Sequence, residues 1–234
     1  MPKTSEKTDQ GGGSENKMSK EVIQKIIDGK IIAIIRGISS ENIIDLVEAI
    51  SKGGVYCAEV TFDQSSAEAA RDTLVAIKKL TEHFGDKVCI GAGTVMSVEQ
   101  VRLAAQAGAK YIISPNVDDD VIAETKRLEL VSIPGAMTAT EVEHAYAAGA
   151  DIVKLFPAGV LGAPYIKALR APLKHIPMTA VGSVNAANCA EFFRAGCCGI
   201  GVGGNLVNKK LVEEGRFDEI TAAAREYAEA IKRL

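Results

Sequence analysis

The sequence predicts an α/β fold, a (β/α)8 TIM barrel in a single domain, on three observations. Short β-branched runs alternate with amphipathic stretches from about residue 19 to the C-terminus. Glycines close the helices just before the strands, at Gly53-Gly54, Gly108, Gly149 and Gly196. The units recur roughly every 20–25 residues, which fits eight strand-helix pairs. An open doubly wound sheet is the alternative, but no GxGxxG turn follows the first run.

Strands are expected where β-branched and apolar residues cluster, and helices where apolar residues recur at helical spacing. The expected strands are residues 31–36, 55–62, 88–91, 110–114, 130–133, the run around Lys154, 178–181 and 199–203. Ser39-Ser40 and Ser65-Ser66 are expected to cap helices that run to Lys52 and about His83. Capping boxes at Ser97–Gln100 and Thr138–Glu141 begin two more helices, and the others are expected over 118–128, 162–171, 186–195, 205–213 and 217–233.

Composition limits the classes of partner. Of 234 residues, 47% are hydrophobic and only 5% are aromatic, so the core must come from Ile, Val, Leu and Ala, which suits a parallel sheet buried on both faces. The net charge of −3 is scattered along the chain, which argues against nucleic acid or a membrane surface as a partner. No apolar stretch approaches the roughly 18 residues that a membrane span requires.

The cysteines and the N-terminal segment bear on location and domain limits. Residues 1–17 are polar and Gly/Ser-rich, and we interpret them as a flexible leader or an expression-derived segment, with the barrel over 18–234. The cysteines form no CxxC pair and most lie in apolar runs, so we expect small core residues of a reduced cytoplasmic protein; a disulfide or metal framework is the alternative. They are Cys57, Cys89, Cys189, Cys197 and Cys198.

Lys154 is the strongest candidate for a catalytic residue. It lies in an apolar run that Pro157 ends, and strand alternation puts Ile152, Lys154 and Phe156 on one face. An ammonium among apolar neighbours loses hydration, which lowers its pKa and leaves neutral amine at cellular pH. A neutral amine attacks carbonyl groups, so the sequence predicts a Schiff-base nucleophile. The alternative is a surface lysine at a sheet edge.

Glu59 is the second candidate. On its strand Tyr56, Ala58, Val60 and Phe62 form an apolar face for packing on helices, so Val55, Cys57, Glu59 and Thr61 are expected to face the barrel interior. A carboxylate there can act as the general base that a tethered ketone needs. The alternative is a buried ion pair that neutralises Lys154.

Other polar groups are expected at the C-terminal ends of the strands, where barrels place their sites. The glycine turns Gly182-Ser183 and Gly203-Gly204 could bind phosphate through backbone N–H groups, or could be tight turns without a ligand. Arg36 could pair with a substrate carboxylate or form a salt bridge at the rim. All three histidines precede strands, at the opposite end, and no ligand cluster follows the strands, so neither a metal nor another cofactor is expected.

These motifs together resemble the 2-keto-3-deoxy-6-phosphogluconate (KDPG) / 4-hydroxy-2-oxoglutarate (KHG) aldolase family. They match in order and spacing from about residue 20 to the C-terminus. The matching residues are Ile35-Arg36, Glu59 to Phe62, Gly91 to Val95, Ile113 to Pro115, Pro134-Gly135 and Lys154 to Ala158.

The resemblance implies a metal-free class I aldolase, usually a homotrimer, that cleaves a 2-keto-4-hydroxy acid to pyruvate and an aldehyde. It implies that Lys154 forms the Schiff base and that Glu59 is the acid/base. Thr94 and an arginine would hold the pyruvyl carboxylate, and Pro115 and Phe156 would wall the pocket. The turns Gly182-Ser183 and Gly203-Gly204 would take the phosphate.

Three positions depart from the family pattern. Asp63 stands where some members carry an arginine, which leaves the carboxylate role to Arg36. Val181 replaces a threonine hydroxyl, and Gly204 stands where a serine often helps to hold phosphate. These changes point to KHG or another keto-deoxy sugar acid as substrates beside KDPG and its galacto epimer. A phosphosugar isomerase or decarboxylase, with Lys154 as an electrostatic group, and a non-catalytic assembly scaffold remain alternatives.

Overall fold

A sheet of parallel strands forms the centre of the molecule. The computed structural model describes residues 15–232. The strands are β1 (Ile31–Ile35), β2 (Cys57–Thr61), β3 (Cys89–Gly93), β4 (Tyr111–Ile113), β5 (Val131–Ile133), β6 (Gly135–Ala136), β7 (Val153–Leu155), β8 (Met178–Val181) and β9 (Gly199–Val202). Their order in the sheet is β5-β4-β3-β2-β1-β9-β8-β7-β6, with every pair parallel. Pairing of β1 with both β2 and β9 makes the ring of a (β/α)8 barrel, as predicted.

The fifth barrel strand is divided. Pro134 has no N–H to donate to the ladder and separates β5 from β6. Its carbonyl still accepts a hydrogen bond from the Lys154 N–H at 2.9 Å. The nine strands therefore correspond to the eight predicted ones, with β5 and β6 as two halves of one strand.

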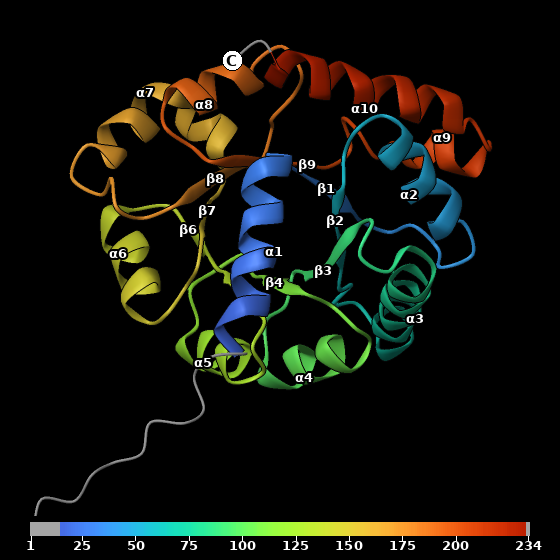
Figure 1. Ribbon diagram of the computed structural model, residues 1–234, viewed down its shortest axis with the longest axis horizontal. Coiled ribbons are helices and arrows are strands. Elements are labelled where there is room, and N and C mark those ends of the chain that lie inside the picture. The colour runs from blue at the N-terminus through green and yellow to red at the C-terminus, as the bar shows by residue number, and fades with distance from the viewer. Residues whose placement is uncertain (1–14, 233–234) are drawn as a thin grey trace, which may run out of the picture.

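Helices alternate with the strands and surround them (Figure 1). They are α1 (Glu15–Gly29), α2 (Ile43–Lys52), α3 (Ala67–Phe84), α4 (Val98–Gln106), α5 (Asp119–Arg127), α6 (Ala139–Ala147), α7 (Ala158–Arg170), α8 (Cys189–Arg194), α9 (Lys209–Glu213) and α10 (Phe217–Lys232). Helix α1 was not predicted, and in Figure 1 it crosses the middle of the ring. Residues 15–17 of the predicted leader belong to α1, whereas residues 1–14 lie outside the described residues.

Two apolar cores hold the barrel. The outer core lies between strands and helices and includes Ala58, Val60, Val153 and Leu155, as strand alternation predicts. The inner core lies inside the ring at its N-terminal end, where α1 packs on the strands. Its members are Val22, Ile26, Ile32, Cys57, Cys89, Tyr111, Ile113, Val131, Ile133 and Ile152.

Two side chains of the β2 segment depart from the predicted alternation. Tyr56, expected to pack on helices, is 53% exposed. Val55, expected in the barrel interior, belongs to the outer core. Both residues precede Cys57, where β2 begins, so strand alternation does not yet govern them.

Two of the predicted helix N-caps are confirmed, and one is wrong. Ser66 caps α3 and Thr138 forms a complete capping box with Glu141, as predicted. The N-cap predicted at Ser39-Ser40 is wrong, because Asn42 occupies the N-cap of α2. The backbone N–H of Ser40 instead donates to Asp72 on α3, at 3.1 Å.

Four other predicted helices are corrected. The Ser97 hydroxyl accepts from the Gln100 N–H, but the Gln100 side chain accepts from the Met96 N–H, so the reciprocal half of that capping box is displaced by one residue. Helix α7 begins at Ala158, four residues early, and Gly162 (φ +77°) interrupts it. Helices α8 and α9 start later than predicted, at Cys189 and Lys209.

The predicted glycine turns are present. Gly54, Gly108, Gly149 and Gly196 have φ between +97° and +110°, the left-handed conformation that ends a helix at little cost for glycine. No helix in the described part of the chain is both long and apolar enough to cross a membrane.

Candidate active site

A cavity of about 710 Å³ opens at the C-terminal ends of the strands. Ten residues singled out from the sequence line it together, although they come from seven different segments of the chain. They are Arg36, Glu59, Thr94, Pro115, Lys154, Phe156, Gly182, Ser183, Gly203 and Gly204. The parallel strands bring these residues to one end of the ring, as barrel geometry requires.

Lys154 lies in the middle of β7 and is only 6% exposed. Its side chain lines the cavity, with Nζ 5.1 Å from the centroid of the Phe156 ring. Burial lowers the pKa of the ammonium, the carboxylate of Glu59 opposes that change, and the charge of Arg36 adds to it. The net lowering raises the fraction of neutral amine that can attack a carbonyl.

Glu59 on β2 is 2% exposed and faces the interior, as predicted. Its carboxyl group lies against the backbone of Gly93, where a Cβ would be 2.7 Å from Cδ. Burial raises the pKa of Glu59, while the charges of Lys154 and Arg36 lower it. Within the described residues it has no ion-pair partner inside 4.0 Å, and its Oε2 has no hydrogen-bond partner. The carboxyl group is therefore not locked onto the lysine, which leaves it able to exchange protons.

Arg36 and Thr94 stand together at the rim of the cavity. Nη2 of Arg36 is 3.5 Å from Oγ1 of Thr94. Thr94 has a left-handed backbone (φ +55°), which its carbonyl secures by accepting from Gln64 Nε2 at 2.8 Å. A guanidinium beside a hydroxyl suits a carboxylate. Asp63 is not part of this pair, because it accepts from the Ser65 N–H at 2.8 Å and does not line the cavity.

The two glycine turns, after the neighbouring strands β8 and β9, form another part of the cavity wall. Gly182 and Ser183 both have left-handed backbones, with φ of +98° and +54°. The Gly182 carbonyl accepts from the Gly159 N–H at 2.8 Å, and the Ser183 carbonyl accepts from Asn188 Nδ2 at 3.1 Å. Both carbonyls are thereby held by neighbouring segments, which fixes the shape of this turn.

The comparisons with known proteins agree with this geometry. A family model described as KDPG and KHG aldolase matches residues 22–223. The chain belongs to this family. It is 35% identical over 203 residues to the 2-dehydro-3-deoxy-6-phosphogalactonate aldolase of Escherichia coli (strain K12), covering 86% of this chain and 96% of that protein. It is also 29% identical to the 2-dehydro-3-deoxy-phosphogluconate aldolase of Haemophilus influenzae (strain ATCC 51907 / DSM 11121 / KW20 / Rd), covering 92% and 98% of the two chains.

The barrel described above is also the fold of a solved structure from this family. A solved structure described as native KDPGal is 35% identical and matches with a TM-score of 0.77, over 87% of this chain and 94% of that one. The chain is accordingly an aldolase, a lyase, with a single-domain barrel. Membership in this family favours the aldolase prediction over the isomerase and decarboxylase alternatives.

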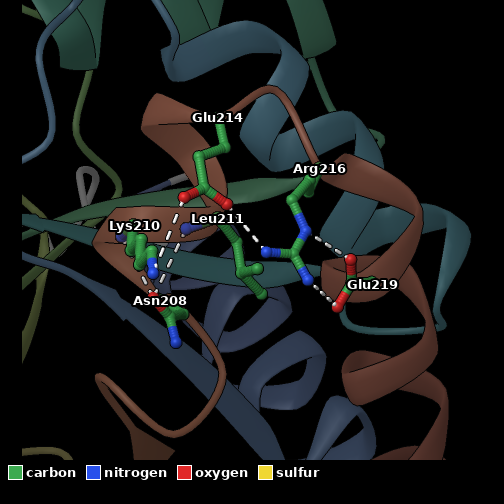
Figure 2. A network of polar contacts seen from close by, with 6 residues as sticks. All are labelled: Asn208, Lys210, Leu211, Glu214, Arg216 and Glu219. Carbon is green, nitrogen blue, oxygen red and sulfur yellow. Dashed lines mark hydrogen bonds and ion pairs between the residues drawn. The ribbon is translucent and has the colours of Figure 1, made fainter.

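Sequence reasoning missed part of the aldolase cavity. Its wall continues through Asn205, Val207, Asn208 and Lys209 at the start of α9. Asn208 is the N-cap of α9, a signal that the sequence offered. Figure 2 shows the polar contacts near the end of α9. The Arg216 guanidinium donates hydrogen bonds to the carboxylate of Glu214, at 2.7 Å, and to that of Glu219, at 2.5 and 2.8 Å. These bonds join the segment that follows α9 to the first turn of α10.

The remaining candidate groups of this aldolase lie elsewhere. None of the histidines lines the cavity: His83 is 3.3 Å from Glu48 and His144 is 2.7 Å from Asp119. Four of the five cysteines are buried, and Cys198 is half-buried. Among the described residues no group of three or more His, Cys, Asp or Glu side chains is arranged to hold a metal ion.

Proposed function

We propose that Lys154 and Glu59 carry the aldolase reaction, in which a 2-keto-4-hydroxy acid is cleaved to pyruvate and an aldehyde without a metal. The observation that carries the proposal is the burial of one amine and one carboxyl group in the same cavity, unpaired with each other. Such a pair supplies a nucleophile and a separate acid/base.

The first half of the reaction makes an electron sink. Neutral Nζ of Lys154 attacks C2 of the substrate, and Glu59 in its acid form protonates the carbinolamine hydroxyl, which leaves as water to give a protonated iminium and an ionised Glu59. Glu59 takes the proton of the C4 hydroxyl, directly or through one water. The C3–C4 bond then breaks, its electron pair passes to the iminium as an enamine, and the aldehyde leaves.

The second half restores the enzyme. Protonated Glu59 returns its proton to C3 of the enamine, which regenerates the iminium, now of pyruvate. Water adds to C2, pyruvate is released, Glu59 takes up the proton that this hydrolysis sets free, and Lys154 is again a neutral amine. Protons and electrons balance within the pair, so no other reactant is needed.

Substrate recognition follows from the cavity walls. We assign the carboxylate to Arg36 and Thr94, and the flat faces of the bound keto acid to Pro115 and Phe156. Backbone N–H groups at Gly182-Ser183 and Gly203-Gly204 would take a phosphate or a second carboxylate. Val181 and Gly204 offer no hydroxyl there, which favours acceptance of unphosphorylated KHG beside KDPG and its galacto epimer.

Reductive trapping tests the nucleophile. Borohydride with pyruvate should reduce the iminium to a stable adduct on Lys154, located by mass spectrometry of proteolytic peptides. Lys154→Ala should show no adduct, and Lys25→Ala, a surface change, should trap normally. An unmodified Lys154 in active enzyme would refute the assignment.

A substrate panel tests recognition. We expect kcat/KM for KHG to lie within about two orders of magnitude of that for the better sugar acid phosphate. Without hydroxyl groups at Val181 and Gly204, the phosphate should form only one or two hydrogen bonds that KHG cannot form. The panel compares KDPG, its galacto epimer and KHG. A loss larger than 10⁴-fold with KHG, which corresponds to about 5.4 kcal/mol, would indicate a dedicated phosphate site instead.

We propose further that the enzyme is a homotrimer. Exposed apolar side chains occur in the segments that follow β6 and β7, with Met137, Val160 and Tyr165 at 44%, 78% and 36% exposure. The Tyr165 hydroxyl donates to the Met137 carbonyl at 2.7 Å, so these two are in contact. Light scattering should give about three times the chain mass of 24.7 kDa, and Val160→Asp should lower it. A monomer at micromolar concentration would contradict the proposal.

A cytoplasmic location is proposed on the chemistry of the thiols. Five free cysteines, none arranged in a disulfide, suit a reducing compartment. Cell fractionation of the native source should place the enzyme with cytoplasmic markers.

A further inference from the structure

Two buried polar atoms stand out inside the barrel. Among the described residues, only Oε2 of Glu59 and the hydroxyl of Tyr111 are buried side-chain polar atoms without a hydrogen-bond partner. An unpartnered buried polar atom costs free energy, so each of the two needs a physical reason.

The two atoms face the same side of β3. The ring of Tyr111, on β4, lies over Gly91, where a Cβ would be 2.5 Å from Cζ, the ring atom that carries the hydroxyl. The carboxyl group of Glu59, on β2, lies over Gly93, where a Cβ would be 2.7 Å from Oε2. Both glycines lack the side chain that would otherwise separate Tyr111 from Glu59.

Strand geometry sets the distance between these positions. Residues two apart on one face of a strand are separated by about 6.6 Å along the strand. Two O–H···O hydrogen bonds in series span about 5.5 Å. The Tyr111 hydroxyl and the Glu59 carboxyl group are not hydrogen-bonded directly. The spacing of Gly91 and Gly93, over which the two groups lie, is comparable to the length of a link through one shared water.

We infer that Tyr111 is a positioning residue for Glu59, with its hydroxyl joined to Oε2 through one bridging water. The bridge holds the carboxyl group over Gly93, facing the cavity, and stabilises its ionised form by hydrogen bonding. Tyr111 does not contact the substrate and acts only through Glu59. This inference rests on the proposed acid/base role of Glu59 and adds a residue to it.

The charges around the pair agree with this arrangement. Burial is the main cause that raises the pKa of the Tyr111 hydroxyl, so it stays protonated and can donate. The negative charges of Cys57, Cys89 and Glu59 act in the same direction on the pKa of Tyr111. The other titratable groups facing the pair are Lys154 and Arg36 beside Glu59, and Cys57 and Cys89 beside Tyr111.

Tyr111→Phe tests the inference, since it keeps the ring that packs on Gly91 and removes only the hydroxyl. The readout is exchange of the pyruvate methyl protons with D2O, followed by NMR, because this exchange needs Lys154 for the enamine and Glu59 for the proton. We expect exchange to slow by about tenfold, the effect of one lost hydrogen bond to an ionised group. The rising limb of the pH profile should move to higher pH, because an ionised Glu59 without its donor has a higher pKa.

Two controls separate this effect from loss of packing. Tyr227→Phe removes the hydroxyl of a buried tyrosine on α10, in the outer core, and should leave the pH profile unchanged. In a Glu59→Gln background, Tyr111→Phe should cause no further loss, because the group through which it acts is gone. Thermal melting of each variant confirms folding.

The outcomes are distinguishable. If Tyr111→Phe exchanges pyruvate protons at the wild-type rate and pH while Lys154 still traps pyruvate, the inference about Tyr111 is wrong and the proposed function stands. If the wild-type enzyme neither traps pyruvate nor exchanges its protons, the proposed function fails and the role of Tyr111 fails with it.

Discussion

Lys154 and Glu59 are buried in the same cavity, and burial favours the neutral form of each. The opposite charge of the other residue favours the ionised form. Burial lowers the pKa of the lysine and raises that of the carboxyl group, while each charge stabilises the other. The amine can therefore be neutral when the substrate arrives, and the carboxyl group can both accept and return a proton. Arg36 adds a positive charge that lowers both pKa values.

Glu59→Gln should reduce turnover by about 10²–10⁴-fold, the usual contribution of a general acid/base. The same change removes the negative charge that raises the pKa of Lys154, so the pH at which pyruvate trapping reaches half its maximum should fall. The trapping rate measured against pH checks this. An unchanged or higher midpoint would mean that the two charges do not interact.

Arg36→Gln should have the opposite effect on the amine. Without the guanidinium the pKa of Lys154 rises, and the trapping midpoint should move to higher pH. KM for pyruvate-containing substrates should rise by about tenfold or more, because the carboxylate loses a charge-assisted hydrogen bond. Arg71→Gln, a change of an exposed arginine on α3, is the matched control.

At this scale, strand alternation was enough to predict the position of the two main residues. It put Lys154 and Glu59 on inward faces, and the structure has both lining one cavity. It could not single out Tyr111, because an aromatic residue in a core strand is indistinguishable in sequence from simple packing. Only coordinates reveal that its hydroxyl has no partner.

Helices α2 and α10 pack closely against each other although they lie far apart in the sequence. A Cβ on Gly53, at the end of α2, would clash with the Ala224 side chain and lie 2.7 Å from the Thr221 carbonyl oxygen on α10. The Thr221 hydroxyl also donates to the Ala49 carbonyl at 3.0 Å. The sequence suggested that glycine for a helix end, whereas the neighbouring Gly54 has the left-handed backbone and Gly53 permits the close approach.

Gly53→Ala should therefore destabilise the protein by about 1–3 kcal/mol, since the added methyl group forces the helices apart. Gly29→Ala is the matched control, because a Cβ there would be 3.6 Å from Cys57 Sγ, an ordinary contact. Urea unfolding of both variants gives the comparison. Equal midpoints for the two variants would contradict the packing argument.

Helix boundaries show where sequence patterns were insufficient. Thr138 and Glu141 satisfy each other locally, so their capping box was predictable. Ser40 has the same cap chemistry, but it is drawn into a contact with Asp72 of α3, which no local pattern contains. Tertiary contacts thus overrode local preference at that end of α2.

The whole molecule is a barrel that is filled at one end and hollow at the other. Helix α1 supplies Val22 and Ile26 to the inner core, which occupies the interior on the side of the strand N-termini. At the other end, glycines at 201 and 203 of the β9 segment leave room for the cavity. The alternation of strands and helices made this architecture predictable, whereas α1 was missed because no element was predicted over residues 18–29, where most of this helix lies.

Ile26→Ala should lower the free energy of unfolding by about 2–5 kcal/mol, the usual cost of truncating a fully buried Ile. Met18→Ala, on the same helix but 56% exposed, should change it by less than about 0.5 kcal/mol. Guanidinium unfolding provides both values. Activity of the folded Ile26→Ala enzyme should be nearly unchanged, because α1 lies at the end opposite the cavity.

Because α1 closes the N-terminal end of the barrel, its position also determines where another molecule can be attached without blocking the cavity. A bead, a carrier protein or a neighbouring catalyst coupled ahead of α1 would lie at the N-terminal end of the barrel. The cavity with the reactive lysine opens at the other end. Small keto acids would then still diffuse in unhindered, whereas the same cargo mounted on the turn after β9 would stand in their path.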